Sequence, residues 1–227
     1  MPNENFLYYA DTKNVPYGGR RDADIKDLTA AAVKKMSAYR LKALLLACNT
    51  ATAAAAESLR KSLPFPVIGI EPALKPAALA AHGKKIILLC TFATARQEKF
   101  KKLLAEVKES IVTVAPQRLW AELIEKNLGN LNGLKETIIS GFCPYLTADT
   151  GAVVLGCTHY LFIKPLLKEI VYETLKTEIP FFDGGEGTAN NLKNILTERD
   201  LLNQNKNGGQ LLIVTSSPTA VNYWNLI

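Results

Sequence analysis

The sequence predicts an α/β protein with mainly parallel sheets. Short apolar runs alternate with amphipathic segments along the whole chain, and this alternation is typical of parallel strands joined by crossover helices. With 227 residues, 48% of them hydrophobic, the chain can bury one large core or two small ones. A proline follows the third apolar run, at Pro72. We therefore expect two α/β domains, one from residues 1–72 plus 181–227 and the other from residues 73–180.

The first half starts with a strand at residues 6–10, followed by a loop that contains Pro16-Tyr17-Gly18-Gly19. Residues 22–38 have apolar side chains at helical spacing and acidic residues at their start, which predicts an amphipathic helix. The same reasoning predicts strands at 43–47 and 66–70 and helices at 51–62 and 72–81.

The second half repeats this alternation. The predicted strands lie at 85–89, 111–115, 152–155, 181–182 and 211–214. The predicted helices lie at 94–107, 119–127, 134–142, 160–177 and 188–197, the fourth of them bent at Pro165. Loops are expected at 183–187 and 203–209, where glycine and polar residues concentrate.

Composition narrows the function classes. No apolar run reaches the length of a membrane span, and the N-terminus does not resemble a signal peptide, so we expect a cytoplasmic protein with no membrane partner. The net charge of +6 comes from lysines scattered along helix faces without an aromatic-interleaved basic motif. This pattern argues against nucleic-acid binding and suits an anionic metabolite.

Two cysteines occupy positions where a thiol can do chemistry. Cys48 and Cys157 each follow an apolar strand and precede a helix, and ligands of parallel α/β folds bind outside the carboxyl ends of the strands. Asn49, Thr50 and Thr158 can cap the helices and help to hold a carboxylate, and His159 can assist its neighbouring thiol as acid or base.

Two opposed thiols suit the inversion of a carbon centre, in which one thiolate removes a proton and the other thiol delivers one to the opposite face. The alternative is that a cysteine on a strand simply fills space, and we assign that role to Cys90 and Cys143. A metal site of Cys48, Cys157 and His159 is a further alternative, but the spacing of these ligands matches no common zinc pattern.

These motifs resemble those of the glutamate racemases, in the aspartate/glutamate racemase superfamily. The resemblance covers nearly the whole chain. It is carried by residues 9–18 (YADTKNVPYG), 47–51 (ACNTA), 70–72 (IEP), 155–160 (LGCTHY) and 183–186 (DGGE).

The resemblance implies that the two domains face each other across an active-site cleft. It implies interconversion of L- and D-glutamate for peptidoglycan synthesis without cofactor or metal, in a possible homodimer. Cys48 and Cys157 would be the catalytic acid and base. The implied substrate contacts are Tyr17, Gly18, Asn49, Thr50, Thr158 and His159, with Glu125 in a supporting role.

The sequence also departs from the family pattern. Family members begin with an apolar strand that leads into Asp-Ser-Gly, and this chain starts after such a segment. We therefore expect an unpaired backbone ladder and exposed apolar surface in the first domain. A second hypothesis follows from this departure, namely a catalytically impaired homologue that acts as a non-catalytic amino-acid-binding or regulatory protein.

Overall fold

The computed structural model describes residues 1–107, 111–204 and 207–217. Within these ranges every strand pair is parallel, and helices connect consecutive strands. The predicted α/β class with parallel sheets is confirmed. None of the described helices combines the length and apolar character that crossing a membrane requires.

A four-stranded sheet forms the larger core. Its strands are β4 (Lys85–Thr91), β5 (Val112–Gln117), β6 (Thr150–Gly156) and β7 (Phe181–Asp183), in the order β5-β4-β6-β7. The central strands β4 and β6 are almost entirely buried, as their continuous runs of apolar residues require.

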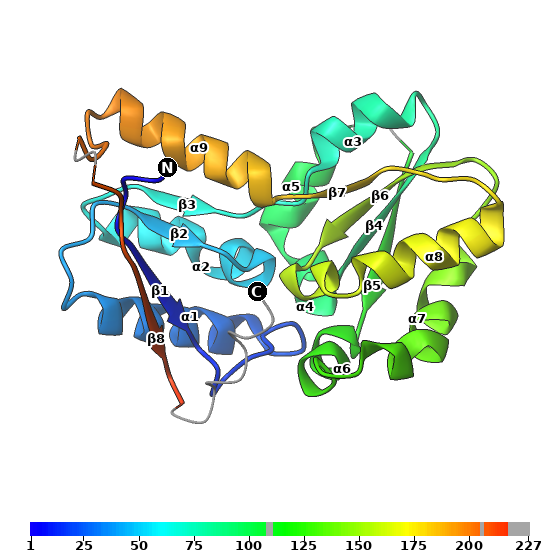
Figure 1. The fold of residues 1–227 in the computed structure, drawn as a ribbon, viewed down its shortest axis with the longest axis horizontal. Coiled ribbons are helices and arrows are strands. Elements are labelled where there is room, and N and C mark those ends of the chain that lie inside the picture. The colour runs from blue at the N-terminus through cyan, green and yellow to red at the C-terminus, as the bar shows by residue number, and fades with distance from the viewer. Residues whose placement is uncertain (108–110, 205–206, 218–227) are drawn as a thin grey trace.

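Helices cover both faces of this sheet (Figure 1). Ile86 and Leu88 point to the face packed by α3 (Leu74–Ala81) and α5 (Glu98–Ala105). Ile87 and Leu89 point to the opposite face, because successive side chains of a strand alternate. That face is covered by α6 (Trp120–Lys126), α7 (Lys135–Phe142) and α8 (Lys164–Leu175).

The other half of the molecule contains a smaller layer built on β2 (Leu44–Leu46) and β3 (Val67–Gly69). Leu44 and Leu46 pack against α1 (Asp22–Met36) and α2 (Asn49–Ser62). Ile68 packs against α9 (Gly185–Glu198) on the opposite face.

Strands β1 (Phe6–Ala10) and β8 (Leu211–Thr215) form a separate two-stranded ladder that is not joined to the β2–β3 pair. Several of its apolar side chains are open to solvent, with Phe6 42% and Leu211 63% exposed. Each of the two ladders consequently keeps an unpaired edge within the described residues, which confirms the expected open ladder.

Three expected elements differ from the structure. The predicted helix 94–107 is two helices, α4 (Phe92–Arg96) and α5, because the backbone of Gln97 is extended and interrupts the helical hydrogen bonds. The predicted bend at Pro165 is wrong: Pro165 lies in the first turn of α8, where its missing N–H costs nothing. The expected loop at 183–187 is shorter, because the Asp183 carboxylate accepts the Gly185 N–H at 3.0 Å and α9 starts there.

Residues 205–206 of the expected loop at 203–209 lie outside the described residues. The remaining short elements are the 3-10 helices η1 (Leu131–Leu134), η2 (Cys143–Tyr145) and η3 (Thr158–Leu161).

The division into residues 1–72 with 181–227 and residues 73–180 stays a proposal. Strand β7 pairs with β6 in the four-stranded sheet, whereas α9 packs on β3 in the other half. On this evidence we place the return to the first half after Asp183 rather than after Pro180.

Candidate active site

The predicted site residues gather where parallel strands end. Cys48 follows β2 and is the N-cap of α2, and Cys157 follows β6 and is the N-cap of η3. Tyr17 and Gly18 lie in the loop after β1. This is the edge at which parallel sheets present their ligand-binding groups.

The two thiols have matching surroundings. Burial raises the pKa of the Cys48 thiol, while hydrogen bonds from the backbone N–H groups of residues 51 and 50 and from the Thr50 hydroxyl act in the opposite direction. Burial likewise raises the pKa of the Cys157 thiol, opposed by the backbone N–H groups of residues 159 and 160. In both cases these N–H groups lie two and three residues after the cysteine, at the start of the helix that follows it.

The two sulfurs also influence each other. After burial, a negative charge on Cys48 is the next cause that raises the pKa of Cys157. Charge on Cys48 also contributes to the raised pKa values of Tyr8 and Tyr17, in which burial is the largest cause. Cys48 and Cys157 therefore share one electrostatic environment, although they pack against different apolar clusters.

His159 and Glu125 form a pair beside Cys157. Nε2 of His159 lies 2.7 Å from Oε2 of Glu125, and Nδ1 lies 4.0 Å from Sγ of Cys157. A carboxylate can only accept a hydrogen bond, so Nε2 of His159 is the donor to Glu125, and in the neutral tautomer with this proton Nδ1 faces the thiol as an acceptor. The side chains are only 19% and 17% exposed, so solvent screens the pair weakly.

The loop after β1 is held by a buried tyrosine. The Tyr17 hydroxyl donates to Oδ2 of Asp11 at 2.6 Å, and the same carboxylate accepts two contacts from the Asn14 amide. Gly18 follows, and a Cβ at this position would lie 2.7 Å from Cγ2 of Thr91. Glycine is thus required here by close packing against the end of β4. The sequence reasoning named Tyr17 and Gly18 but not Asp11 as site residues.

Three threonine hydroxyls form a closed triangle next to Cys48. Oγ1 of Thr50 lies 3.0 Å from Oγ1 of Thr91 and 3.1 Å from Oγ1 of Thr94, and the last two atoms are 3.0 Å apart. The three side chains are buried. Thr91 and Thr94 were missed from the sequence, although Thr91 ends a buried strand and accepts the Thr94 N–H as the N-cap of α4.

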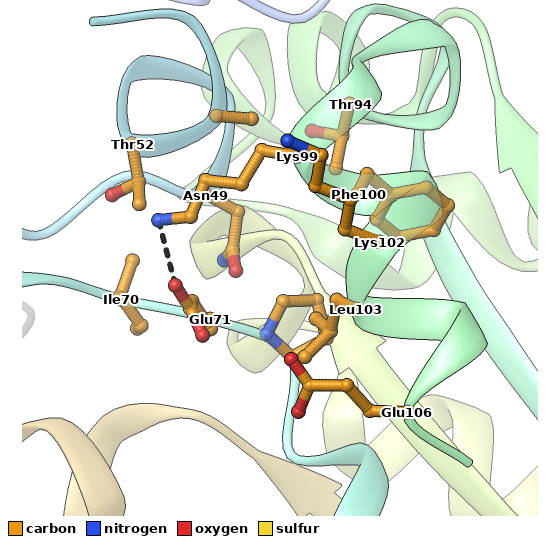
Figure 2. A pocket seen from close by; sticks show the side chains of 12 residues that line it. Asn49, Thr52, Ile70, Glu71, Thr94, Lys99, Phe100, Lys102, Leu103 and Glu106 are labelled. Carbon is orange, nitrogen blue, oxygen red and sulfur yellow. Dashed lines mark ion pairs between the residues drawn. The ribbon is translucent and has the colours of Figure 1, made fainter. Parts of the chain in front are cut away.

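Two cavities adjoin this triangle. A cavity of about 210 Å³ is lined by Asn49 and Thr94 and by the Glu71–Lys99 ion pair, 2.6 Å long (Figure 2). A second cavity of about 320 Å³ is lined by Gly18 and Thr91. Neither cavity is lined by Cys48 or Cys157. Asn49 is buried, and its Oδ1 atom has no hydrogen-bond partner among the residues that the structure describes.

The other predicted residues lie as follows. Thr158 is partly buried and begins η3 directly after Cys157. Cys90 is fully buried in the core beside α3 and α5, and burial raises its pKa to about 12. Cys143 packs against the core on the opposite face of the sheet. Both of these cysteines have the packing role that was expected.

The fold is α/β with parallel sheets, and one cysteine follows a strand in each half of the molecule. Residues 5–192 match the Asp/Glu/Hydantoin racemase family. The glutamate racemase of Clostridium botulinum strain Alaska E43 is 39% identical over 219 residues, which are 96% of this chain and 83% of the relative.

Solved structures show the same relationship. The glutamate racemase isoform RacE1 of Bacillus anthracis has a TM-score of 0.78 at 28% identity, covering 95% of this chain and 80% of the other. The Escherichia coli glutamate racemase, in complex with L-glutamate and the activator UDP-MurNAc-Ala, has a TM-score of 0.72 at 28% identity, covering 95% and 81%. The chain belongs to the Asp/Glu/Hydantoin racemase family.

Proposed function

We propose that the chain interconverts L- and D-glutamate without a cofactor, with Cys48 and Cys157 as the acid and base. The observation that carries this proposal is the matched setting of the two thiols, each of which directly follows a parallel strand and is the N-cap of the helix after it. A reaction that runs in both directions needs two groups that can exchange roles, and similar surroundings are what such an exchange requires.

In the proposed reaction a thiolate takes the α-proton of glutamate and becomes a thiol. The electron pair of the broken C–H bond stays on the α-carbon and spreads into the α-carboxylate. The opposite thiol then gives its proton to the other face of that carbon and becomes a thiolate. The enantiomer is released with the two sulfurs in exchanged protonation states.

The electrostatic coupling of the thiols supports this sequence of steps. Because charge on Cys48 raises the pKa of Cys157, ionisation of one thiol disfavours ionisation of the other. The coupling therefore disfavours the doubly ionised pair, so that when one sulfur is a thiolate the other stays a thiol, the state from which proton removal and delivery can both start. On the Cys157 side, Nδ1 of His159 is the acceptor that can take up the thiol proton.

Glutamate as the substrate is inferred from the relatives, since the E. coli protein was solved with L-glutamate. The residues proposed to contact it are Tyr17, Gly18, Asn49, Thr50, Thr158 and His159, with Glu125 supporting His159. The formal charge of +6 suits an anionic substrate. A role in supplying D-glutamate for peptidoglycan and assembly as a homodimer are further parts of the proposal.

Proton exchange in deuterated water tests the proposal. NMR of D- or L-glutamate should show loss of the Cα–H signal when the protein is added. Racemisation should fall at least about 100-fold in Cys48→Ala and in Cys157→Ala, since a positioned acid or base contributes that much. Cys143→Ala is the matched control and should keep full activity. Full turnover in both of the first two variants would disprove the two-thiol mechanism.

A further inference from the structure

The loop between β1 and α1, residues 11–21, carries Tyr17 and Gly18, two of the proposed substrate contacts. Part of its shape is fixed from within. Nε and Nη2 of Arg20 donate to the Asn14 carbonyl at 3.1 Å and 2.6 Å. This bond, like that of the Tyr17 hydroxyl described above, stays inside the loop, so it does not determine where the loop lies against the other half of the molecule.

Helix α4 of the other half holds the loop at two points. The backbone N–H of Ala93 donates to the Gly18 carbonyl at 3.1 Å. The Arg96 side chain donates from Nη2 to the Arg20 carbonyl and from Nε to the Asp22 carboxylate, the second bond being 2.8 Å long. Arg96 therefore contacts both the end of the loop and the first residue of α1.

A guanidinium group suits this double contact. Its N–H groups form a rigid planar fork, so one side chain can serve a carboxylate and a carbonyl together. Asp22 is available to Arg96 because the neighbouring Arg21 pairs with Asp24 instead, at 2.8 Å. The side chains of Arg96 and Asp22 are 45% and 41% exposed, so their ion pair adds little to global stability. Its loss should act on the loop rather than on the fold.

The position of the loop matters because the loop forms one wall of the cavity of about 320 Å³. Gly18 and Arg20 line this cavity from the loop, whereas Thr91 and Ala121 line it from the other half. The backbone of Gly18 approaches Thr91 so closely that a Cβ would lie 2.7 Å from Cγ2 of Thr91. A small displacement of the loop would therefore change the width of the cavity.

We propose that Arg96 is a positioning residue that holds the substrate-binding loop against the other half of the molecule. The inference rests on the proposed function, since it takes Tyr17 and Gly18 as substrate contacts. Without the Arg96 contacts the loop occupies its binding position for only part of the time, and the apparent affinity for substrate falls by that fraction. Bound substrate keeps the loop in place, so the chemical step is unchanged.

Steady-state racemisation by Arg96→Gln separates binding from chemistry. The KM for L- and for D-glutamate should rise about 3- to 10-fold, while kcat stays within twofold of wild type. Asp22→Asn should raise KM less, because the bond from Arg96 to the Arg20 carbonyl remains. The double variant should match Arg96→Gln, since the two changes remove one shared contact.

Hydrogen exchange of the ligand-free protein gives a second readout that needs no turnover. The Ala93 N–H, which bonds to Gly18 across the two halves, should exchange about 3- to 10-fold faster in Arg96→Gln, as followed by two-dimensional NMR. Arg21→Gln is the matched control. It removes an equivalent two-pronged contact, from Arg21 to Asp24, that lies entirely in the first half, so it should leave KM and Ala93 exchange within twofold of wild type.

An active Arg96→Gln protein with an unchanged KM would overturn the proposal, as would an unchanged rate of Ala93 exchange. A loss confined to kcat, or equal effects in Arg21→Gln, would overturn it as well. If Arg96→Gln does not fold, Asp22→Asn takes its place in both measurements. A wild-type protein that does not racemise glutamate, but whose Ala93 exchange rises in Arg96→Gln alone, would refute the proposed function and leave the holding role of Arg96 intact.

Discussion

Replacement of Glu125 by glutamine is the sharpest test of how the site handles protons. The change keeps the size of the side chain and removes the carboxylate that lies 2.7 Å from Nε2 of His159. A glutamine amide can still accept the Nε2 proton through its oxygen, but without the negative charge, or it can donate to Nε2 and so move the imidazole proton to Nδ1. In both cases Nδ1 becomes a poorer acceptor for a proton from Cys157, 4.0 Å away.

The size of the effect follows from the burial of the pair. With exposed fractions of 19% and 17%, the charge-assisted hydrogen bond is worth about 1.5–3 kcal/mol. If that energy supports the transition state, kcat/KM falls about 10- to 100-fold. L- and D-glutamate have equal free energies in water, so kcat/KM must fall equally in both directions.

The assay follows the optical rotation of glutamate from each enantiomer, together with iodoacetamide labelling of Cys157 as a function of pH. Glu122→Gln is the matched control. Glu122 lies on the same helix, is exposed, and forms a 2.6 Å ion pair with Lys126, so its loss should change kcat/KM less than twofold.

A folded Glu125→Gln protein with kcat/KM within twofold of wild type would refute the reasoning. Unequal losses in the two directions would indicate a flaw in the assay, because the overall equilibrium constant is unity. A loss of similar size in Glu122→Gln would point to a general effect on α6 rather than to His159.

Two further predictions concern packing and pH. Gly18→Ala places a Cβ 2.7 Å from Cγ2 of Thr91, so it should destabilise the protein by about 1–3 kcal/mol and reduce turnover. Gly19→Ala is the control and should do neither, because no atom lies within 4 Å of its added Cβ. Equal urea midpoints for the two variants would contradict the predicted clash. Cys90 has its pKa raised from 9.0 to about 12, so the unfolded chain ionises first and the free energy of unfolding should fall between about pH 9 and 12, by up to about 4 kcal/mol. Cys90→Ala should lessen this loss in urea titrations, and an unchanged slope would refute the assignment.

The spacing of apolar residues along the chain was sufficient to predict most of the helices and strands. Alternating apolar and amphipathic segments predicted the strands and helices of both halves, because burial of an apolar face depends mainly on local spacing. The break at Gln97 and the placement of Pro165 at the start of α8 were not predictable in this way. An extended residue between two helices and a proline in a first turn leave no distinct mark on the apolar pattern.

The residues of the candidate site likewise divide into those that the sequence identified and those that only the structure revealed. Cys48, Cys157 and His159 were identifiable because reactive side chains directly follow apolar strands, and the order of residues alone establishes that relation. Thr91 and Thr94 carry side chains common at helix caps, and only their approach to Thr50 from the other half of the molecule distinguishes them.

The sequence by itself determined the fold class, the positions of the two thiols and the polar residues that follow them, since these depend on neighbours along the chain. The tertiary structure decided the remainder: the pairing of His159 with Glu125, the contact of Gly18 with Thr91, the threonine triangle, and the separation of the β1–β8 ladder from β2–β3. Each of these joins residues from different elements, and distances between elements are set by packing of the whole chain rather than by any local pattern.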